Sequence, residues 1–230
     1  MESLIKLNNQ TAGRDKIARL LQYLSRYLWH RFQYHQKGGV HNLKALEYQL
    51  STFRKLLRFG RCVESLYTVA QSWQNPNLSI RLSVTLSKIC HAIFLFADHI
   101  LWLGRSDLYT INTDKWSSIS NRYWLFSIIM NLVRDFYEIL VILKTNRSRI
   151  LPKYGLKDFN DIFSCSANAA ICVQGYQNVV VDTVKNCCDV FIPLTALGHT
   201  KLSPGTIGLL GVISSIAGII SLVQPAAKLV

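Results

Sequence analysis

The residues from Ser203 to Ala227 carry no charged side chain, and this stretch constrains the fold more than any other part of the 230-residue chain. Within it, residues 206–223 are apolar apart from Thr, Ser and Gly. A helix over these residues, rising about 1.5 Å per residue, reaches about 27 Å, which is close to the thickness of bilayer hydrocarbon. Pro204 suits the first turn of such a helix because its nitrogen needs no helical hydrogen bond. The stretch therefore predicts a transmembrane helix over 206–223.

Positive charge is concentrated near the start of an otherwise apolar chain. Lys and Arg number 26 against 13 Asp and Glu, and 50% of the residues are hydrophobic whereas only 17% are charged. Residues 1–61 alone hold 12 Lys and Arg and 3 Asp and Glu, a net charge of +9. A chain that is both apolar and basic fits two kinds of partner, nucleic acid or the anionic surface of a membrane.

Two amphipathic helices are expected in this basic region, over 14–34 and 42–59. Apolar residues recur in both at three- and four-residue spacing, with Arg and Lys between them. Gly38-Gly39 is expected to separate the helices, with Asn42 as the N-cap of the second and Gly60 as its C-cap.

A leucine stripe beside basic residues is typical of an interfacial helix that lies in the headgroup layer. The alternative is that the two stripes pack on each other as a helical hairpin. Because a membrane span is predicted in the same chain, an anionic phospholipid membrane is the expected partner, and no nucleic acid is expected. The residues predicted to bind the membrane are Leu43, Leu46, Leu50, Phe53, Arg54, Lys55, Leu57 and Arg58.

Two further apolar helices are expected over 80–104 and 122–143. Both contain ionisable residues, which cost about 2.5–3.5 kcal/mol each at the centre of a bilayer. These helices are therefore expected to pack in a bundle or to span with their polar faces covered. Arg134 and Glu138 lie four residues apart and are expected to pair, either on the surface or as a buried pair that organises helices within the membrane.

The pattern as a whole predicts an all-α fold, a helical integral membrane protein with amphipathic N-terminal helices and a C-terminal transmembrane helix. It divides into a basic amphipathic region over 1–77, an apolar helical region over 78–143, a basic connector over 144–160 and C-terminal helices over 161–230.

A stripe of small residues follows one face of the C-terminal helix. Such stripes let helix backbones approach closely in lipid. Self-association through this face is one expectation, and the alternative is that Gly and Ser are simply common in helices of this kind. The residues of the predicted oligomerisation stripe are Gly211, Ser214, Gly218 and Ser221.

No motif of catalysis, nucleotide binding or zinc binding is present. The sequence lacks G-x-G-x-x-G, a Walker loop, H-E-x-x-H and G-x-S-x-G, and its six His residues do not combine with Cys at zinc spacing. The six Cys residues form no C-x-x-C pair and are expected to be reduced thiols. We therefore expect no enzyme activity, no cofactor and no metal.

Several short strings along the chain resemble, in this order, the peroxin eleven family of peroxisomal membrane proteins, most closely its animal beta-type member. The strings are Arg54 to Gly60, Ile100 to Arg105, Arg122 to Leu132 with Arg134-Asp135 and Tyr137-Glu138, Val184 to Asn186 with Cys188-Asp189, Phe191 to Leu194 with Leu197-Gly198, and Ser203 to Gly205 with Gly208-Leu209 and Gly211.

This resemblance implies a non-enzymatic protein of the peroxisomal membrane whose amphipathic N-terminal region elongates the membrane before fission, and so controls peroxisome proliferation, size and number. It also implies homo-oligomers, association with fission adaptor proteins and a dynamin-related GTPase, and delivery by the import receptor for peroxisomal membrane proteins. Both termini are expected to face the cytosol.

Two other functions remain open at this point. A pore or metabolite channel would use polar residues within the apolar helices, namely Lys88, His91, Asp98, Arg134 and Glu138, to line a conduit. A scaffold would recruit the fission machinery without acting on lipid itself.

Overall fold

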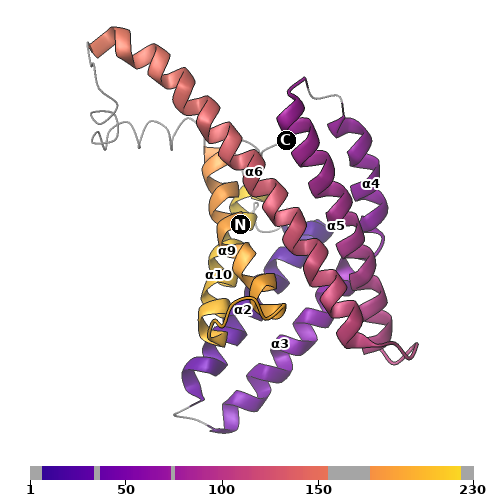
Figure 1. Ribbon diagram of the computed structural model, residues 1–230. Helices are drawn as coiled ribbons and strands as arrows, with labels where there is room; N and C mark the ends of the chain where they lie inside the picture. Colours follow the sequence, from indigo (N-terminus) through magenta and orange to yellow (C-terminus); the bar gives the residue numbers. More distant parts are fainter. Residues whose placement is uncertain (1–6, 34–36, 74–75, 155–176, 224–230) are drawn as a thin grey trace.

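The computed structural model describes residues 7–33, 37–73, 76–154 and 177–223, and these described residues form helices joined by short connections, without a strand (Figure 1). The predicted all-α fold is thus confirmed. The helices are α2 (Thr11–Phe32), α3 (Lys37–Leu57), α4 (Arg61–Ser72), α5 (Leu78–Arg105), α6 (Thr113–Tyr154), α9 (Gln177–Ala196) and α10 (Pro204–Val223).

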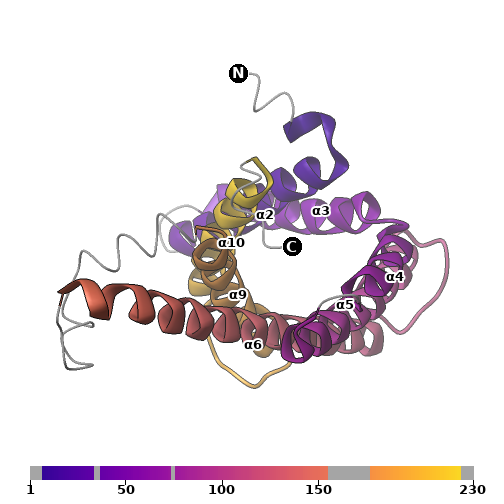
Figure 2. The same ribbon diagram turned by 90° about the horizontal axis from the view of Figure 1, so that it is seen from above.

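The helices are arranged in a ring, which is clearest from above (Figure 2). In this ring α2 packs against α3 and α10, α5 packs against α6 and more lightly against α3, and α9 lies between α6 and α10. Helix α4 packs against α5. The contact between α2 and α10 closes the ring, so the N-terminal and C-terminal parts of the chain meet in space.

Small residues make the close contact between α10 and α2 possible. A Cβ atom on Gly211 would lie 2.2 Å from Cγ of Tyr23, and one on Gly208 would lie 2.7 Å from the backbone nitrogen of Tyr27. Ser214 is completely buried. The backbones can therefore approach only because these positions lack bulk.

The predicted oligomerisation stripe lies on this same face of α10. Gly211 and Gly218 lie against Tyr23 and Lys16 of α2. Ser214 is buried with them, and Ser221 is half-buried. The structure therefore gives the stripe a partner within its own chain. The outward face of α10 carries larger side chains instead, Leu209, Ile213, Ile216 and Ile220.

The helix bounds match the predicted pattern at the C-terminal end and differ in the middle. Helix α10 covers the predicted span and begins at Pro204, and the Ser203 hydroxyl accepts a hydrogen bond from the Thr206 backbone nitrogen at 3.1 Å. Helix α3 begins at Lys37, so the predicted break at Gly38-Gly39 and the predicted N-cap at Asn42 are wrong. Gly60, with a φ of 78°, makes the left-handed turn between α3 and α4.

Helix α6 is longer than the periodicity indicated. It begins at Thr113, because the Asn112 side chain accepts a hydrogen bond from the Lys115 backbone nitrogen at 3.0 Å, and it continues to Tyr154. The predicted connector over 144–160 is thus helical as far as Tyr154, and the rest of it lies outside the described residues. The same holds for the first part of the helix expected from about 161, of which Gln177–Ala196 is described.

Replacing Gly211 by Leu should destabilise the monomer, because the added side chain overlaps the Tyr23 ring. Overpacking of this kind costs about 1–3 kcal/mol. We expect a lower midpoint of thermal unfolding, followed by circular dichroism in detergent. Ile216→Leu, on the exposed face of the same helix, is the matched control. Loss of oligomers with an unchanged midpoint would instead assign Gly211 to contacts between copies.

Candidate membrane-facing surface and buried charge network

Large apolar side chains are exposed on many of the described helices. In water such extended apolar surface is costly, whereas in a bilayer it is solvated by acyl chains. These exposed side chains include Leu46, Phe53, Leu56, Val63 and Leu66 on α3 and α4, Leu82, Leu86 and Phe96 on α5, and Phe126, Val133 and Phe136 on α6.

The buried positions are rich in charge, which is the reverse of a water-soluble domain. Nine Asp, Lys and Arg side chains of the described residues are buried, and so is His99: Asp15, Arg19, Arg54, Lys55, Asp98, Arg134, Asp135, Asp182 and Asp189. Charges buried in this way need partners, because an isolated ion in a low-dielectric interior is strongly destabilising.

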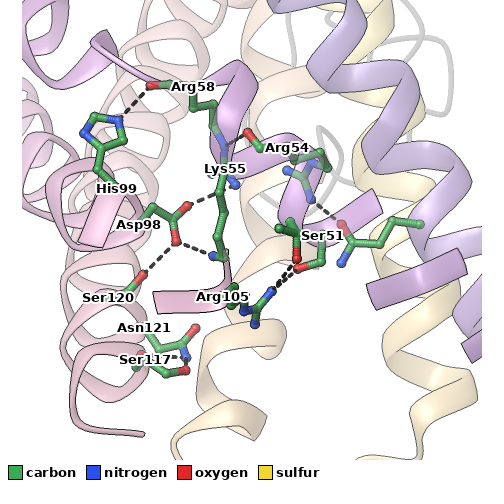
Figure 3. A network of polar contacts seen from close by, with 12 residues as sticks. Ser51, Arg54, Lys55, Arg58, Asp98, His99, Arg105, Ser117, Ser120 and Asn121 are labelled. Atoms are coloured by element: carbon green, nitrogen blue, oxygen red, sulfur yellow. Dashed lines mark hydrogen bonds and ion pairs between the residues drawn. The ribbon is translucent and has the colours of Figure 1, made fainter. Parts of the chain in front are cut away.

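Asp98 is the centre of the first charge network, which Figure 3 shows from close by. This carboxylate on α5 is 1% exposed. It accepts a hydrogen bond from Nζ of Lys55 at 2.5 Å, and the Arg58 guanidinium lies 3.0 Å from its other oxygen. Ser120 of α6 lies 3.4 Å away. Lys55 at the end of α3 and Arg58 directly after it are therefore fixed to α5, although these helices otherwise make only a light contact.

Asp15 extends this network from α3 to α2. Its carboxylate accepts a hydrogen bond from Nε of Arg54 at 3.0 Å and lies 3.7 Å from Arg58. Burial raises the pKa of Asp15, but Arg54 and Arg58 lower it by more, to about 2. Burial lowers the pKa of Lys55 to about 8, although Asp98 opposes that shift.

A second network joins α6 to α9. The Arg134 guanidinium lies 2.8 Å from Asp135 and 3.0 Å from Asp182, and the Asn186 amide donates to Asp135 at 2.7 Å. Arg134 is therefore paired across helices, and the ion pair expected with Glu138 is not among its contacts. Burial raises the pKa of Glu138, while the nearby Arg134 opposes the change.

A third contact reaches from α2 to α9. Arg19 and Asp189 are both buried and form an ion pair. Among the described residues, no group of three or more His, Cys, Asp or Glu side chains is placed to hold a metal ion. The ion pairs among the buried charges of these networks join four pairs of helices.

The predicted membrane-binding residues separate into an outer and an inner set. Leu46 and Phe53 are each 47% exposed on the outside of α3, and Leu43, Leu50 and Leu57 are half-buried. Arg54, Lys55 and Arg58 lie inward, where Asp15 and Asp98 are their partners. Helix α3 thus presents leucine and phenylalanine outward while its cations hold the protein together.

The residues predicted to line a conduit also lie in different surroundings. Asp98 and Arg134 are buried in the networks described above. Lys88 instead donates to the Ser72 hydroxyl at 2.5 Å, between α5 and α4, and His91 lies against the Phe94 ring.

Neither Asp15 nor Asp189 was predicted to be a site residue. Their position gives a reason to expect an ion pair, because an Asp within a basic, apolar segment needs a cationic partner. What the sequence lacked was the identity of that partner, because Asp15 and Arg54 are 39 residues apart and Arg19 and Asp189 are 170 residues apart.

Within the described part of the chain, two helices are long and apolar enough to cross a membrane, Leu78–Arg105 and Pro204–Val223, whose apolar windows have mean hydropathies of 1.5 and 2.2. Only 39% of the apolar window of each helix is buried inside the chain, so most of each window is exposed. Together with the apolar outside and the charged inside, these helices define the class as a helical integral membrane protein.

The chain belongs to the family of peroxisomal biogenesis factor 11, whose model matches residues 1–223. It is 30% identical to human peroxisomal membrane protein 11B and 34% identical to human peroxisomal membrane protein 11A, with 100% of this chain and 99% of each relative covered. A homolog from Dictyostelium discoideum is 27% identical over 95% of the chain and 92% of its own length. The predicted family is confirmed, whereas likeness to the beta type in particular is only weakly resolved. No solved structure matches the chain significantly.

These relatives are peroxisomal membrane proteins, and the protein described here is therefore a peroxisomal membrane protein involved in peroxisome biogenesis. The predicted localisation to the peroxisomal membrane is confirmed.

Replacing Asp98 by Asn should strongly destabilise the fold, because Lys55 and Arg58 would remain buried without their anion. Removing one partner of a buried pair costs about 3–5 kcal/mol. Thermal unfolding in detergent measures the loss. Asp107→Asn is the control, because Asp107 is exposed and its φ of 54° suits Asn. Equal midpoints for the two variants would show that the Asp98 network does not stabilise the ring.

Proposed function

We propose that this protein remodels the peroxisomal membrane without catalysis, elongating it and promoting the fission that controls peroxisome proliferation, size and number. The observation that carries the proposal is the outward apolar face of α3 and α4, with Leu46, Phe53, Leu56, Val63 and Leu66 exposed. A helix face of this kind partitions into the boundary between headgroups and acyl chains.

The mechanism we propose is shallow wedging of one leaflet. Side chains that enter the cytosolic leaflet to a small depth expand it relative to the opposite leaflet, which favours positive curvature. The ion pairs of Lys55 and Arg58 with Asp98 hold α3 against α5, a helix apolar enough to span the membrane. Lys44 is exposed beside the Trp29 ring and Arg61 is half-exposed beside Glu64, and we propose that both cations also bind anionic headgroups.

Partners belong to the same proposal. We expect homo-oligomers that concentrate the wedges, fission adaptor proteins and a dynamin-related GTPase that complete division, and the import receptor for peroxisomal membrane proteins. Cytosolic termini would place α3 and α4 at the leaflet where these partners are found. The small-residue stripe of α10 faces α2 within the chain, so self-association is expected through other surfaces.

Liposome remodelling tests the wedge. Full-length protein reconstituted into anionic liposomes should form tubules, and Leu46→Glu combined with Phe53→Glu should reduce tubulation about tenfold or more, because each exposed apolar side chain contributes about 1.5–3 kcal/mol when it enters hydrocarbon. Electron microscopy of tubule length measures the effect.

The control for this experiment adds a charge away from α3. Asn112→Asp places a negative charge at an exposed helix cap and should leave tubulation unchanged. Tubulation by the double variant at the level of the unchanged protein would contradict the wedge. Recruitment of fission proteins without any tubulation by the pure protein would favour the scaffold function.

A pore or metabolite channel is the second candidate, and a specific observation favours it. Ionisable side chains are buried between the helices of a closed ring while large apolar side chains are exposed, and ionisable residues within membrane helices mark paths for polar solutes in many transport proteins. Glu138 is half-buried beside Arg134 and Asp182 and is suited to affect ion selectivity.

Conductance in planar bilayers tests the channel. If ions pass Glu138, Glu138→Gln should shift the reversal potential under a salt gradient toward anion selectivity, because one negative charge is lost. Glu64→Gln removes an exposed charge on α4 and should have no effect. No conductance from the unchanged protein, under conditions in which it tubulates liposomes, would contradict the channel.

A further inference from the structure

A thiol and an imidazole from two different helices lie together at the start of α4. Sγ of Cys62 is 3.9 Å from Nδ1 of His99 on α5. The His99 side chain is buried, whereas Cys62 is half-buried and reachable from outside. A nucleophile beside a base, both supported by the surrounding fold, is the arrangement from which thiol chemistry starts.

The fold fixes which nitrogen of His99 faces the thiol. Nε2 lies 3.0 Å from the backbone carbonyl oxygen of Arg58, and Figure 3 shows this contact. A carbonyl oxygen only accepts hydrogen bonds, so Nε2 carries the proton and Nδ1 presents its lone pair toward Cys62. The Phe59 ring packs on the imidazole, with centroids 4.8 Å apart, and helps to hold its orientation.

The position of Cys62 on α4 is at the beginning of the helix. It is the second residue of this helix, directly after the turn at Gly60. The sulfur therefore lies beside a turn, where Cys62 is half-buried, rather than in the middle of a packed helix.

The surroundings of Cys62 indicate what the thiol would carry. Leu66 follows one helical turn later on the same face of α4, Phe59 precedes it by one turn, and Val63 is adjacent, all three with large exposed apolar side chains. These residues belong to the surface that faces lipid. A hydrocarbon chain attached at Cys62 would lie along these three side chains.

We propose that Cys62 is a site of S-acylation, that it is activated by His99, and that its acyl donor is a long-chain acyl-coenzyme A thioester. The thiol proton passes to Nδ1 of His99 as the sulfur attacks the thioester carbonyl carbon. A new carbon–sulfur bond forms, the carbon–sulfur bond to coenzyme A breaks, and coenzyme A leaves as a thiol with the proton returned by His99. No oxidant is needed. The acyl chain would anchor the start of α4 in the leaflet.

The test uses full-length protein in liposomes, incubated with an alkyne-tagged palmitoyl-coenzyme A, with the labelled peptides identified by mass spectrometry. Cys187 is the internal control, because it is an exposed free thiol. We expect label at Cys62 to form at least about tenfold faster than at Cys187. The label should be released by neutral hydroxylamine and resist mild reductant, as a thioester does and a disulfide does not.

Variants separate activation by His99 from simple exposure. His99→Gln can keep a hydrogen bond to the Arg58 carbonyl but supplies no base, and it should reduce the Cys62 rate about tenfold or more, to the level of Cys187. Circular dichroism checks that this variant folds. Equal rates at Cys62 and Cys187 in the unchanged protein, or an undiminished rate in a folded His99→Gln variant, would overturn the proposal.

This inference rests on the membrane contact of α4 that the proposed function includes, but the two can fail separately. Cys62→Ser should lose the label while its reconstituted form still tubulates liposomes, because the apolar side chains of α3 are unchanged. Failure of tubulation with normal labelling would affect the proposed function alone.

Discussion

The carboxylate of Asp98, buried and shared by two cations, is the contact on which the arrangement of α3 depends. Helix α3 packs against α2, makes only light contact with α5, and exposes large apolar side chains such as Leu46 and Phe53. Lys55 and Arg58 therefore hold it in place through Asp98, while Arg54 ties it to Asp15 of α2. In a low-dielectric interior each of these ions is tolerable only because the others are present. The outward face of α3 is thus a product of inward charge pairing.

The sequence predicted the helices well where one local signal dominated. Helix α10 was recognised because residues 206–223 lack charge, and Pro204 and Ser203 mark its start. Prediction failed where tertiary structure overrode local preference: Gly38, Gly39 and Asn42 read as a helix boundary yet lie within α3. Membrane binding by the predicted residues stays a prediction, and the structure gives only their surroundings. Leu46 and Phe53 are exposed as an interfacial helix requires, but the direction of Arg54 and Lys55 depends on acids 39 and 43 residues away, which periodicity cannot reveal.

The small residues on α10 form a pattern that is compatible with two different kinds of neighbouring helix. Gly208, Gly211 and Gly218 form a face that any neighbouring helix could approach, and the sequence does not distinguish a second copy from another helix of the same chain. In the structure that neighbour is α2, with Tyr23 and Tyr27 against the glycines. Family membership fixes the coarse function as peroxisome biogenesis at the membrane, and the apolar face of α3 and α4 supplies the physical basis for the finer proposal.

The pairing of α2 with α10 makes two helices that are far apart in the sequence depend on each other during synthesis. A ribosome makes α2 well before α10, so the ring cannot close until α10 has been made. Until then Tyr23 of α2 lacks its contact with Gly211, and Arg19 lacks its ion pair with Asp189, because these partners are made much later. A nascent chain with such distant contacts is prone to aggregation and needs protection in the cytosol. Premature termination before residue 204 would leave a ring that cannot close.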